Sequence, residues 1–366
     1  MKKAVSIIMM LVIFVCTFPC VNAAEEVTYD LSLAQAIELA FTDNERIIAN
    51  EHKQLAGEIA INSAYLARKP YKKMAVNVSS NFDLYCLKEG YYIESAEMAH
   101  RLSVKEAERI ESSIAYSVTE AYYNLVLMKK LTQAAGNAVK LAQTNKDIVN
   151  KQYSIGLIAH LDYENASLAT MSAQSALDTY RMNEKIAEEN LKILLNIDDE
   201  NVRINPTDEI ECGEYSSDCN ADAENALSTR YDVMALRESM NLAYQYYDLS
   251  SVLTKSSATY NSAYASYLEA QYNYNSTSKL IKLSIKTAYN NIVNSLDKMN
   301  ISQKQYEIKL KEYEAAKIKY ELGVIANIEL TKAINDLYDA QVSYANAKLS
   351  YRMAIEKYKY EITTGL

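Results

Sequence analysis

Apolar residues recur at heptad spacing through the C-terminal part of the chain. One row begins at Leu330 and a second begins three places later, at Ala333. A sustained pattern of two such rows lets helices pack side by side over a long distance. It therefore predicts one long helix whose seam mixes large residues with alanines. The rows are Leu330, Leu337, Tyr344, Tyr351 and Tyr358, and Ala333, Ala340, Ala347 and Ala354.

Three earlier segments carry the same seam. The segment after residue 160 repeats it, with weaker positions at Thr170 and Glu184, and the segments that run up to Gly156 and Gly323 carry it too. A helix from residue 94 to 155 would be about 90 Å long at the standard rise. A single globular core cannot enclose such a rod, so its partners must be equally long. The seam residues before the two glycines are Leu131, Ala134, Ala138, Leu141 and Ile148, and Ile292, Leu296, Met299, Tyr306, Leu310 and Tyr313.

Two glycines interrupt these runs in the same setting. Gly156 lies in "YSIGLIAHLDYENA" and Gly323 in "YELGVIANIELTKA". Glycine adopts the left-handed conformation that closes a helix C-terminus. Asp162 and Glu329 then fall in the first turn of each returning helix, where a negative charge favours the helix dipole. The pattern predicts two hairpin tips, near residues 156–161 and 323–328.

The two tips belong to an internal duplication. Placing Gly156 on Gly323 also places Tyr153 on Tyr320 and Ala166 on Ala333. Self-similarity at a fixed offset is typical of a repeated structural unit. It predicts a first helical-hairpin repeat over residues 24–196, an acidic connector over 197–222 and a second repeat over 223–366.

One segment departs from the helical pattern. Residues 69–93 contain Pro70 and an alternation of Met74, Val76 and Val78, which is typical of one or two short strands or of an extended loop. The corresponding part of the second repeat spaces its tyrosines at a helical interval. The predicted fold is all-α, with at most a small β element around residues 72–86.

Composition supports long helices and excludes some functions. The chain holds only 7 Gly and 3 Pro among 366 residues, and helix interiors disfavour both. Its net charge is −9, and it becomes −11 once Lys2 and Lys3 are removed. Nucleic-acid binding requires clustered basic residues, so no nucleic-acid partner is expected.

The N-terminal sequence indicates export. "MKKAVSIIMMLVIFVCTFPCVNA" has a basic start, an apolar run and small residues at its end, the layout of a signal peptide over residues 1–23. A retained anchor and lipidation at Cys20 are the alternatives. No later stretch is apolar for long enough to form a membrane-spanning helix.

No pattern of residues points to catalysis. The mature part keeps Cys86, Cys212 and Cys219, which form neither a disulfide framework nor a metal motif. Cys212 and Cys219 either pair in an oxidising compartment or remain free thiols. The three histidines are not at ligand spacing, and phosphate loops and nucleophile elbows are missing. We expect no enzyme activity, no cofactor and no metal.

Four segments in this order resemble a known family. "LSLAQAIELAFTDNERI", "YSIGLIAHLDYENA", "ALSTRYDVMALRESM" and "YELGVIANIELTKA" are similar to segments of TolC-type outer-membrane efflux proteins. The resemblance implies a homotrimer whose long helices form a hollow α-helical barrel across the periplasm. It also implies a periplasmic adaptor and an inner-membrane transporter as partners, and a location at the cell outer membrane and in the periplasm.

The resemblance also suggests a role for the tips. It implies that residues there dock the adaptor or constrict the opening, while helix capping at Asp162 and Glu329 and a solvated loop position for His160 are the alternatives. Ile325 stands where the family member best known for a closed tip has an arginine, so a salt-bridged lock of that kind is not expected. The candidate residues for the gate or the adaptor contact are Gly156, His160, Asp162, Gly323, Asn327 and Glu329.

The chain departs from the family in its membrane part. The family inserts strands in both repeats, and a transmembrane strand takes about 9 to 11 residues. Residues 69–93 have room for at most two, which implies a reduced or absent β-barrel. The functional prediction is an efflux or secretion duct, and the alternative is an exported coiled-coil structural protein without a pore. Membrane association fits either reading.

Overall fold

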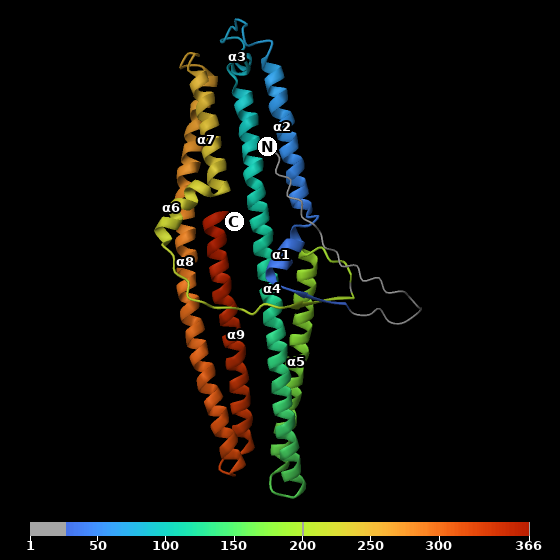
Figure 1. The fold of residues 1–366 in the computed structure, drawn as a ribbon. Helices are drawn as coiled ribbons and strands as arrows, with labels where there is room; N and C mark the ends of the chain where they lie inside the picture. Colours follow the sequence, from blue (N-terminus) through green and yellow to red (C-terminus); the bar gives the residue numbers. More distant parts are fainter. Residues whose placement is uncertain (1–26, 200, 366) are drawn as a thin grey trace, which may run out of the picture.

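The computed structural model describes residues 27–199 and 201–365. The predicted signal peptide and Cys20 lie outside the described residues. The molecule is elongated, with two long helical hairpins side by side at one end and shorter helices packed on them at the other (Figure 1). The helices are α1 Leu33–Phe41, α2 Glu45–Arg68, α3 Phe82–Glu89, α4 Tyr91–Ser154, α5 His160–Leu194, α6 Cys219–Thr229, α7 Tyr231–Ser250, α8 Ala258–Glu321 and α9 Asn327–Thr363, and the strands are β1 Val27–Leu31 and β2 Val202–Pro206.

The helix lengths make the duplication visible. α4 and α8 each have 64 residues. The helices that return from them, α5 and α9, have 35 and 37 residues. A helix of the longer kind spans about 96 Å at 1.5 Å per residue. The long helices expected from the heptad pattern are therefore confirmed.

The heptad seam lies between the helices of each hairpin. α5 packs along α4, α9 packs along α8, and contacts of α9 with α4 join the two hairpins. Leu330, Tyr351 and Tyr358 are buried, whereas Leu337 and Tyr344 are half-buried. Alternating alanines let the helix axes approach, as the pattern predicted. The buried seam residues of α5 are Ala166, Leu177, Ala187 and Leu191.

A two-stranded parallel sheet lies beside the middle of α4. β1 pairs with β2 in the register Val27 with Val202. Tyr122, fully buried on α4, donates its hydroxyl hydrogen to the carbonyl oxygen of Leu31 at 2.8 Å. The backbone N–H of Leu33 donates to the Asp208 carboxylate at 2.6 Å, which fixes the start of α1. Segments far apart in sequence are joined here.

The segment after β2 crosses α9 as an extended strap on its way to α6 (Figure 1). The hydroxyl of Tyr351 donates to the carbonyl oxygen of Gly213 at 3.0 Å, and the Tyr215 ring packs edge-on against Tyr358. Cys212 and Cys219, which this segment carries, are both free thiols in the structure. Side chains of the second hairpin, not a disulfide, therefore hold the strap in place.

The structure forms no strand around residues 72–86, where the sequence allowed at most a small β element. Residues 69–81 form turns and irregular backbone, which matches the extended-loop alternative, and α3 follows. Asn81 caps α3 by accepting from the third helical N–H, and Gly90 ends it with φ 96°. Local capping therefore favours a helix where the short apolar alternation suggested a strand.

Candidate functional site

Both hairpin tips lie at the same end of the molecule (Figure 1). Residues 155–159 reverse the chain between α4 and α5, and residues 322–326 reverse it between α8 and α9. The turns occupy the positions that the glycine pattern predicted. The structure thus brings together the six candidate residues, three from each repeat.

Glycine closes each long helix as predicted. Gly156 has φ 77°, its N–H donates to the carbonyl of Tyr153, and the N–H of Leu157 donates to the carbonyl of Gln152, both at 2.9 Å. This pair of bonds is the Schellman ending, which needs a left-handed residue. The same two bonds close the second tip around Gly323, where φ is 72°.

The two acidic candidates differ in their surroundings. Asp162 and Glu329 each lie in the first turn of a helix, as expected, and the residues that precede these helices are alanines without a side-chain cap. Asp162 is half-buried, whereas Glu329 is exposed. Burial raises the pKa of the Tyr320 hydroxyl, the bond to Gln152 opposes this, and the charge of Asp162 adds to it. Asp162 therefore lies near enough to the second repeat for its charge to reach Tyr320, whereas Glu329 faces solvent.

The tips also differ in their aromatic content. The His160 ring lies edge-on to Tyr153 at 5.4 Å, and Tyr153 stacks on Tyr163 at 5.8 Å. The His160 imidazole is 3.6 Å from the Glu164 carboxylate, and both side chains are largely exposed. Asn327 takes the place of His160 in the second repeat and is buried at 7% exposure. Equivalent positions therefore present different chemistry on the two tips.

A groove runs between the hairpins just above the tips. α4 and α8 form its walls, α9 forms its floor, and its volume is about 350 Å³. The hydroxyl of Tyr320 donates to the side-chain oxygen of Gln152 across the groove at 3.0 Å. Deeper in, the Asn145 amide donates to the hydroxyl of Thr331 at 3.1 Å. These two bonds tie α4 of the first hairpin to α8 and α9 of the second.

The sequence interpretation did not single out these four residues. One signal was available, because Asn145 continues the heptad row of Leu131 and Ala138. A polar residue in an apolar seam often fixes register or partner. Gln152 is the next position of that row, but its bond to Tyr320 depends on how the two hairpins lie against each other.

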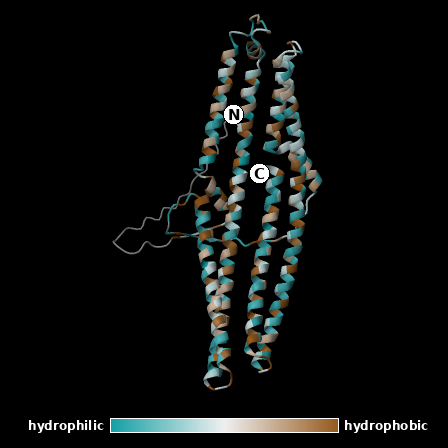
Figure 2. Cartoon of the chain, turned by 180° about the vertical axis from the view of Figure 1, so that it is seen from behind, coloured by the Kyte–Doolittle hydropathy of each residue, from teal (hydrophilic) through white to brown (hydrophobic). Residues whose placement is uncertain are grey.

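The tips expose large apolar side chains. Leu157 and Leu322 are at least 70% exposed, and Val324 is almost equally so. Hydrophobic and hydrophilic positions alternate along the helices down to this end (Figure 2). Side chains of this kind on a loop favour contact with another protein.

We also searched the described part of the chain for metal sites and for membrane-spanning helices. There, no group of three or more His, Cys, Asp or Glu side chains could hold a metal ion. Within the same residues, no helix has the length and apolar character needed to cross a membrane.

Comparisons with known proteins point to export channels. Residues 253–357, which form most of the second hairpin, match the outer membrane efflux protein family. Toxin and drug export protein A from Aggregatibacter actinomycetemcomitans is 23% identical over 342 residues, which cover 91% of this chain and 68% of that protein. This family is one of transport channels, not of enzymes.

Solved structures share the fold. The CmeC outer membrane channel of Campylobacter jejuni has a TM-score of 0.70 at 14% identity, covering 95% of this chain and 93% of that one. The outer membrane protein VceC from Vibrio cholerae has a TM-score of 0.72 at 14% identity, covering 91% and 97%. The second hairpin thus resembles the outer membrane efflux protein family, and the chain shares the fold of TolC-like outer membrane channels over nearly its whole length.

Proposed function

We propose that three copies of this chain close into a ring whose helices line an export duct. The resemblance to the outer membrane efflux protein family supports a role in the cell envelope, at the outer membrane and in the periplasm. The proposal rests on two rows of exposed apolar side chains, one on α5 and one on α8, which form the outer edges of the paired hairpins.

The order of helices across the lower half leaves two free edges. α9 packs against α4, while α8 and α5 flank this pair on opposite sides (Figure 1). Each flanking helix carries large apolar side chains that are more than half exposed. On α5 these are Leu161, Leu168, Met171, Met182, Ile186 and Ile193, and on α8 they include Ile301, Ile308 and Ile318.

Both rows become buried if α5 of one copy packs against α8 of the next. Such a contact joins different surfaces of the two copies, and repeated contacts of this kind form a ring when the rotation closes. Exposed contiguous apolar rows are uncommon on monomeric proteins. A ring of two-hairpin units is hollow along its axis, which supports a duct over a solid bundle.

The tips then form the constricted end of the duct. We assign Gly156 and Gly323 to the shape of the tips, and His160, Asp162, Asn327 and Glu329, at the starts of α5 and α9, to the gate or to contact with an adaptor. The exposed apolar tip residues suit docking of a periplasmic adaptor that connects to an inner-membrane transporter. Adaptor binding opens the tips by favouring the splayed arrangement over the closed one.

The name of the matched relative indicates only the class of molecules that is exported. That protein is named as an exporter of toxin and drug. We assign exported small molecules or proteins as substrates, moved passively while the transporter supplies the energy.

The assembly test uses native mass together with cross-linking. Met182→Cys on α5 and Ile301→Cys on α8 lie at similar heights above the tips, 22 residues after His160 and 20 before Glu321. In a background without native cysteines, a bifunctional maleimide should link copies up to a trimer. The matched control pairs Met182→Cys with Ser350→Cys, an exposed residue of α9, which does not lie at a free edge. A native mass of one or two copies contradicts the ring and favours the coiled-coil spacer.

A further inference from the structure

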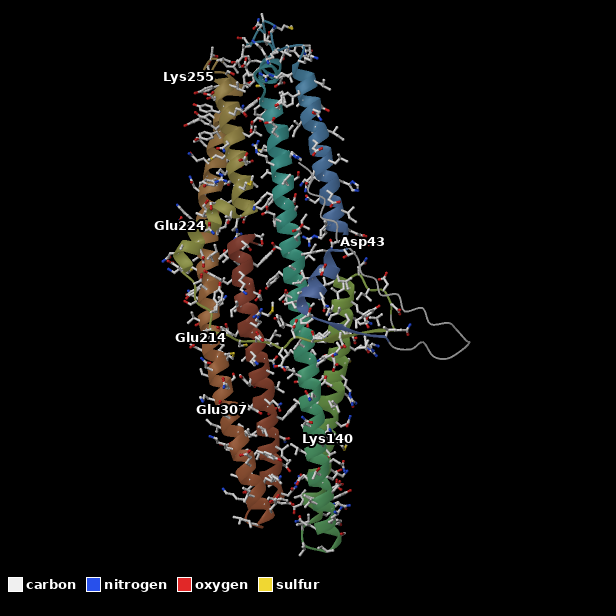
Figure 3. The ribbon with its side chains drawn as sticks, in the orientation of Figure 1. Asp43, Lys140, Glu214, Glu224, Lys255 and Glu307 are labelled. Carbon is white, nitrogen blue, oxygen red and sulfur yellow. The ribbon has the colours of Figure 1, made fainter. Side chains whose placement is uncertain are left out.

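A second pocket, larger than the tip groove, lies where the strap crosses the hairpins. The strap comprises residues 207–218, and Glu214 marks it in Figure 3. Side chains of α4, α8, α9 and the strap form a pocket of about 480 Å³, which is within the size range of small-molecule sites. We call it the strap pocket.

The base of the strap pocket is apolar, and small side chains leave it open. Leu127 and Leu131 of α4 line it and are buried. Ile210 also lines it and is the one buried residue of the strap. On α9 the pocket is lined by Ala345, which lies in sequence between the longer side chains of Tyr344 and Lys348. The strap thus covers this space without filling it.

Two aromatic rings form a flat part of the wall. Tyr306 of α8 and Tyr344 of α9 both line the pocket, and their rings stack with centroids 6.0 Å apart and planes 16° apart. Both side chains are half-buried, so part of each remains open to contact. Aromatic surfaces of this kind favour another flat ring in an offset or edge-on arrangement.

The charged wall residues have an excess of positive charge. Lys130, Lys348 and Glu209 line the pocket, and the Lys130 ammonium lies 3.4 Å from the Glu209 carboxylate. Lys348 is half-buried, and its ammonium forms no ion pair or hydrogen bond with any residue that the structure describes. Glu307, close by on α8 (Figure 3), is paired with Lys304 at 2.8 Å. A partly desolvated ammonium group without a partner favours an anion.

The thiol of Cys212 senses the same positive charge. Its Sγ lies 3.6 Å from the carbonyl oxygen of Lys348. Burial raises the pKa of this thiol, and the charges of Lys348, Arg352 and Lys130 oppose the rise. Arg352 is itself paired with Glu356 at 2.9 Å. The free positive charge beside the pocket is therefore that of Lys348.

We infer that the strap pocket binds a small organic anion with a flat ring, such as an aromatic carboxylate. The carboxylate pairs with Lys348, and the ring packs against Tyr344 and Tyr306. An inorganic anion would leave the aromatic wall unused, and a neutral ring would leave Lys348 without a partner. All wall residues belong to one copy of the chain, so a monomer would bind the ligand equally well.

The test measures binding of 1-naphthoate to the purified full chain by isothermal titration calorimetry. It should occupy a single saturable site, and 1-naphthalenemethanol, which keeps the ring and lacks the charge, should bind about tenfold more weakly. Lys348→Gln should weaken naphthoate binding by a similar factor, because it removes the charged partner, whereas Lys348→Arg should preserve it. The matched control is Lys357→Gln, at an exposed position of α9 that does not line the pocket.

The opposite results overturn the inference. They are the lack of a saturable site for naphthoate, equal binding of the alcohol, and equal loss in Lys348→Gln and Lys357→Gln. Ala345→Phe should fill the pocket and abolish binding, so a folded variant that still binds naphthoate as tightly as the unmodified chain also refutes it. The tip groove holds a lysine beside tyrosines as well. Loss of binding in Lys317→Gln but not in Lys348→Gln would place the probe there and contradict the strap pocket.

Discussion

Removing the two bonds across the tip groove should open the hairpin tips. Tyr320→Phe keeps the ring and deletes the hydroxyl that donates to Gln152. Thr331→Val keeps the shape of the side chain and deletes the hydroxyl that accepts from the Asn145 amide. Neither change leaves a cavity, so the effect reports the bonds between the hairpins.

The expected change in free energy follows from the burial of each group. Loss of the Tyr320 bond costs about 1 kcal/mol, the usual net value for such a hydrogen bond. Asn145 is only 4% exposed, so Thr331→Val leaves a buried amide without its acceptor, at about 1–3 kcal/mol. Together the changes shift the equilibrium between closed and open tips by about 2–4 kcal/mol, which is roughly 30-fold to 1,000-fold.

The assay combines single-channel conductance in planar bilayers with distances between spin labels on the two tips. The double variant should show higher conductance and longer or broader tip distances. The matched control applies the same chemistry elsewhere on α8, with Tyr272→Phe and Thr287→Val, both at exposed positions. Unchanged conductance and distances in a folded double variant would refute the idea that these bonds hold the tips together.

Two further predictions concern the helix ends and the tyrosines. Gly156→Ala should lower the free energy of unfolding by about 1 kcal/mol, because no atom lies within 4 Å of the added methyl and only the positive φ opposes it. Gly136→Ala, in the interior of α4 with equally open space, should raise stability by about 0.5–1 kcal/mol, and urea unfolding that shows the same sign for both would contradict this account. Burial raises the pKa of Tyr358 and its bond to Asp222 adds to the rise, so its stabilising contribution is complete below the unfolded pKa near 10 and is lost as the pH climbs through the higher folded pKa. Absorbance of phenolate against pH should show this tyrosine ionising late, and Tyr358→Phe should remove the late step.

The local features of the tips were readable from sequence because their causes are local. A glycine that ends a heptad run, followed by an acidic residue in the next helical turn, specifies a reversal through backbone conformation and helix-dipole effects. The positions of Gly156, Gly323, Asp162 and Glu329 follow directly. The different burial of the two acids does not follow, because it depends on how the hairpins face each other.

The sheet shows why other features escaped prediction. β1 and β2 lie 175 residues apart and pair in parallel, and neither strand is longer than 5 residues. A strand this short has little signal of its own and forms only when its partner is brought to it. The apolar alternation in residues 72–86 was a similar signal, yet no partner strand meets it there, and capping turned part of it into α3.

The sequence by itself determined the long helices, their seams, the tips and the duplication, since each depends on periodicity or on one residue's backbone freedom. Only the tertiary structure decided that the second hairpin lies against α4 and that Tyr320 reaches Gln152. Each of these joins residues far apart in the chain, and heptad seams of similar composition do not encode which hairpin face meets which.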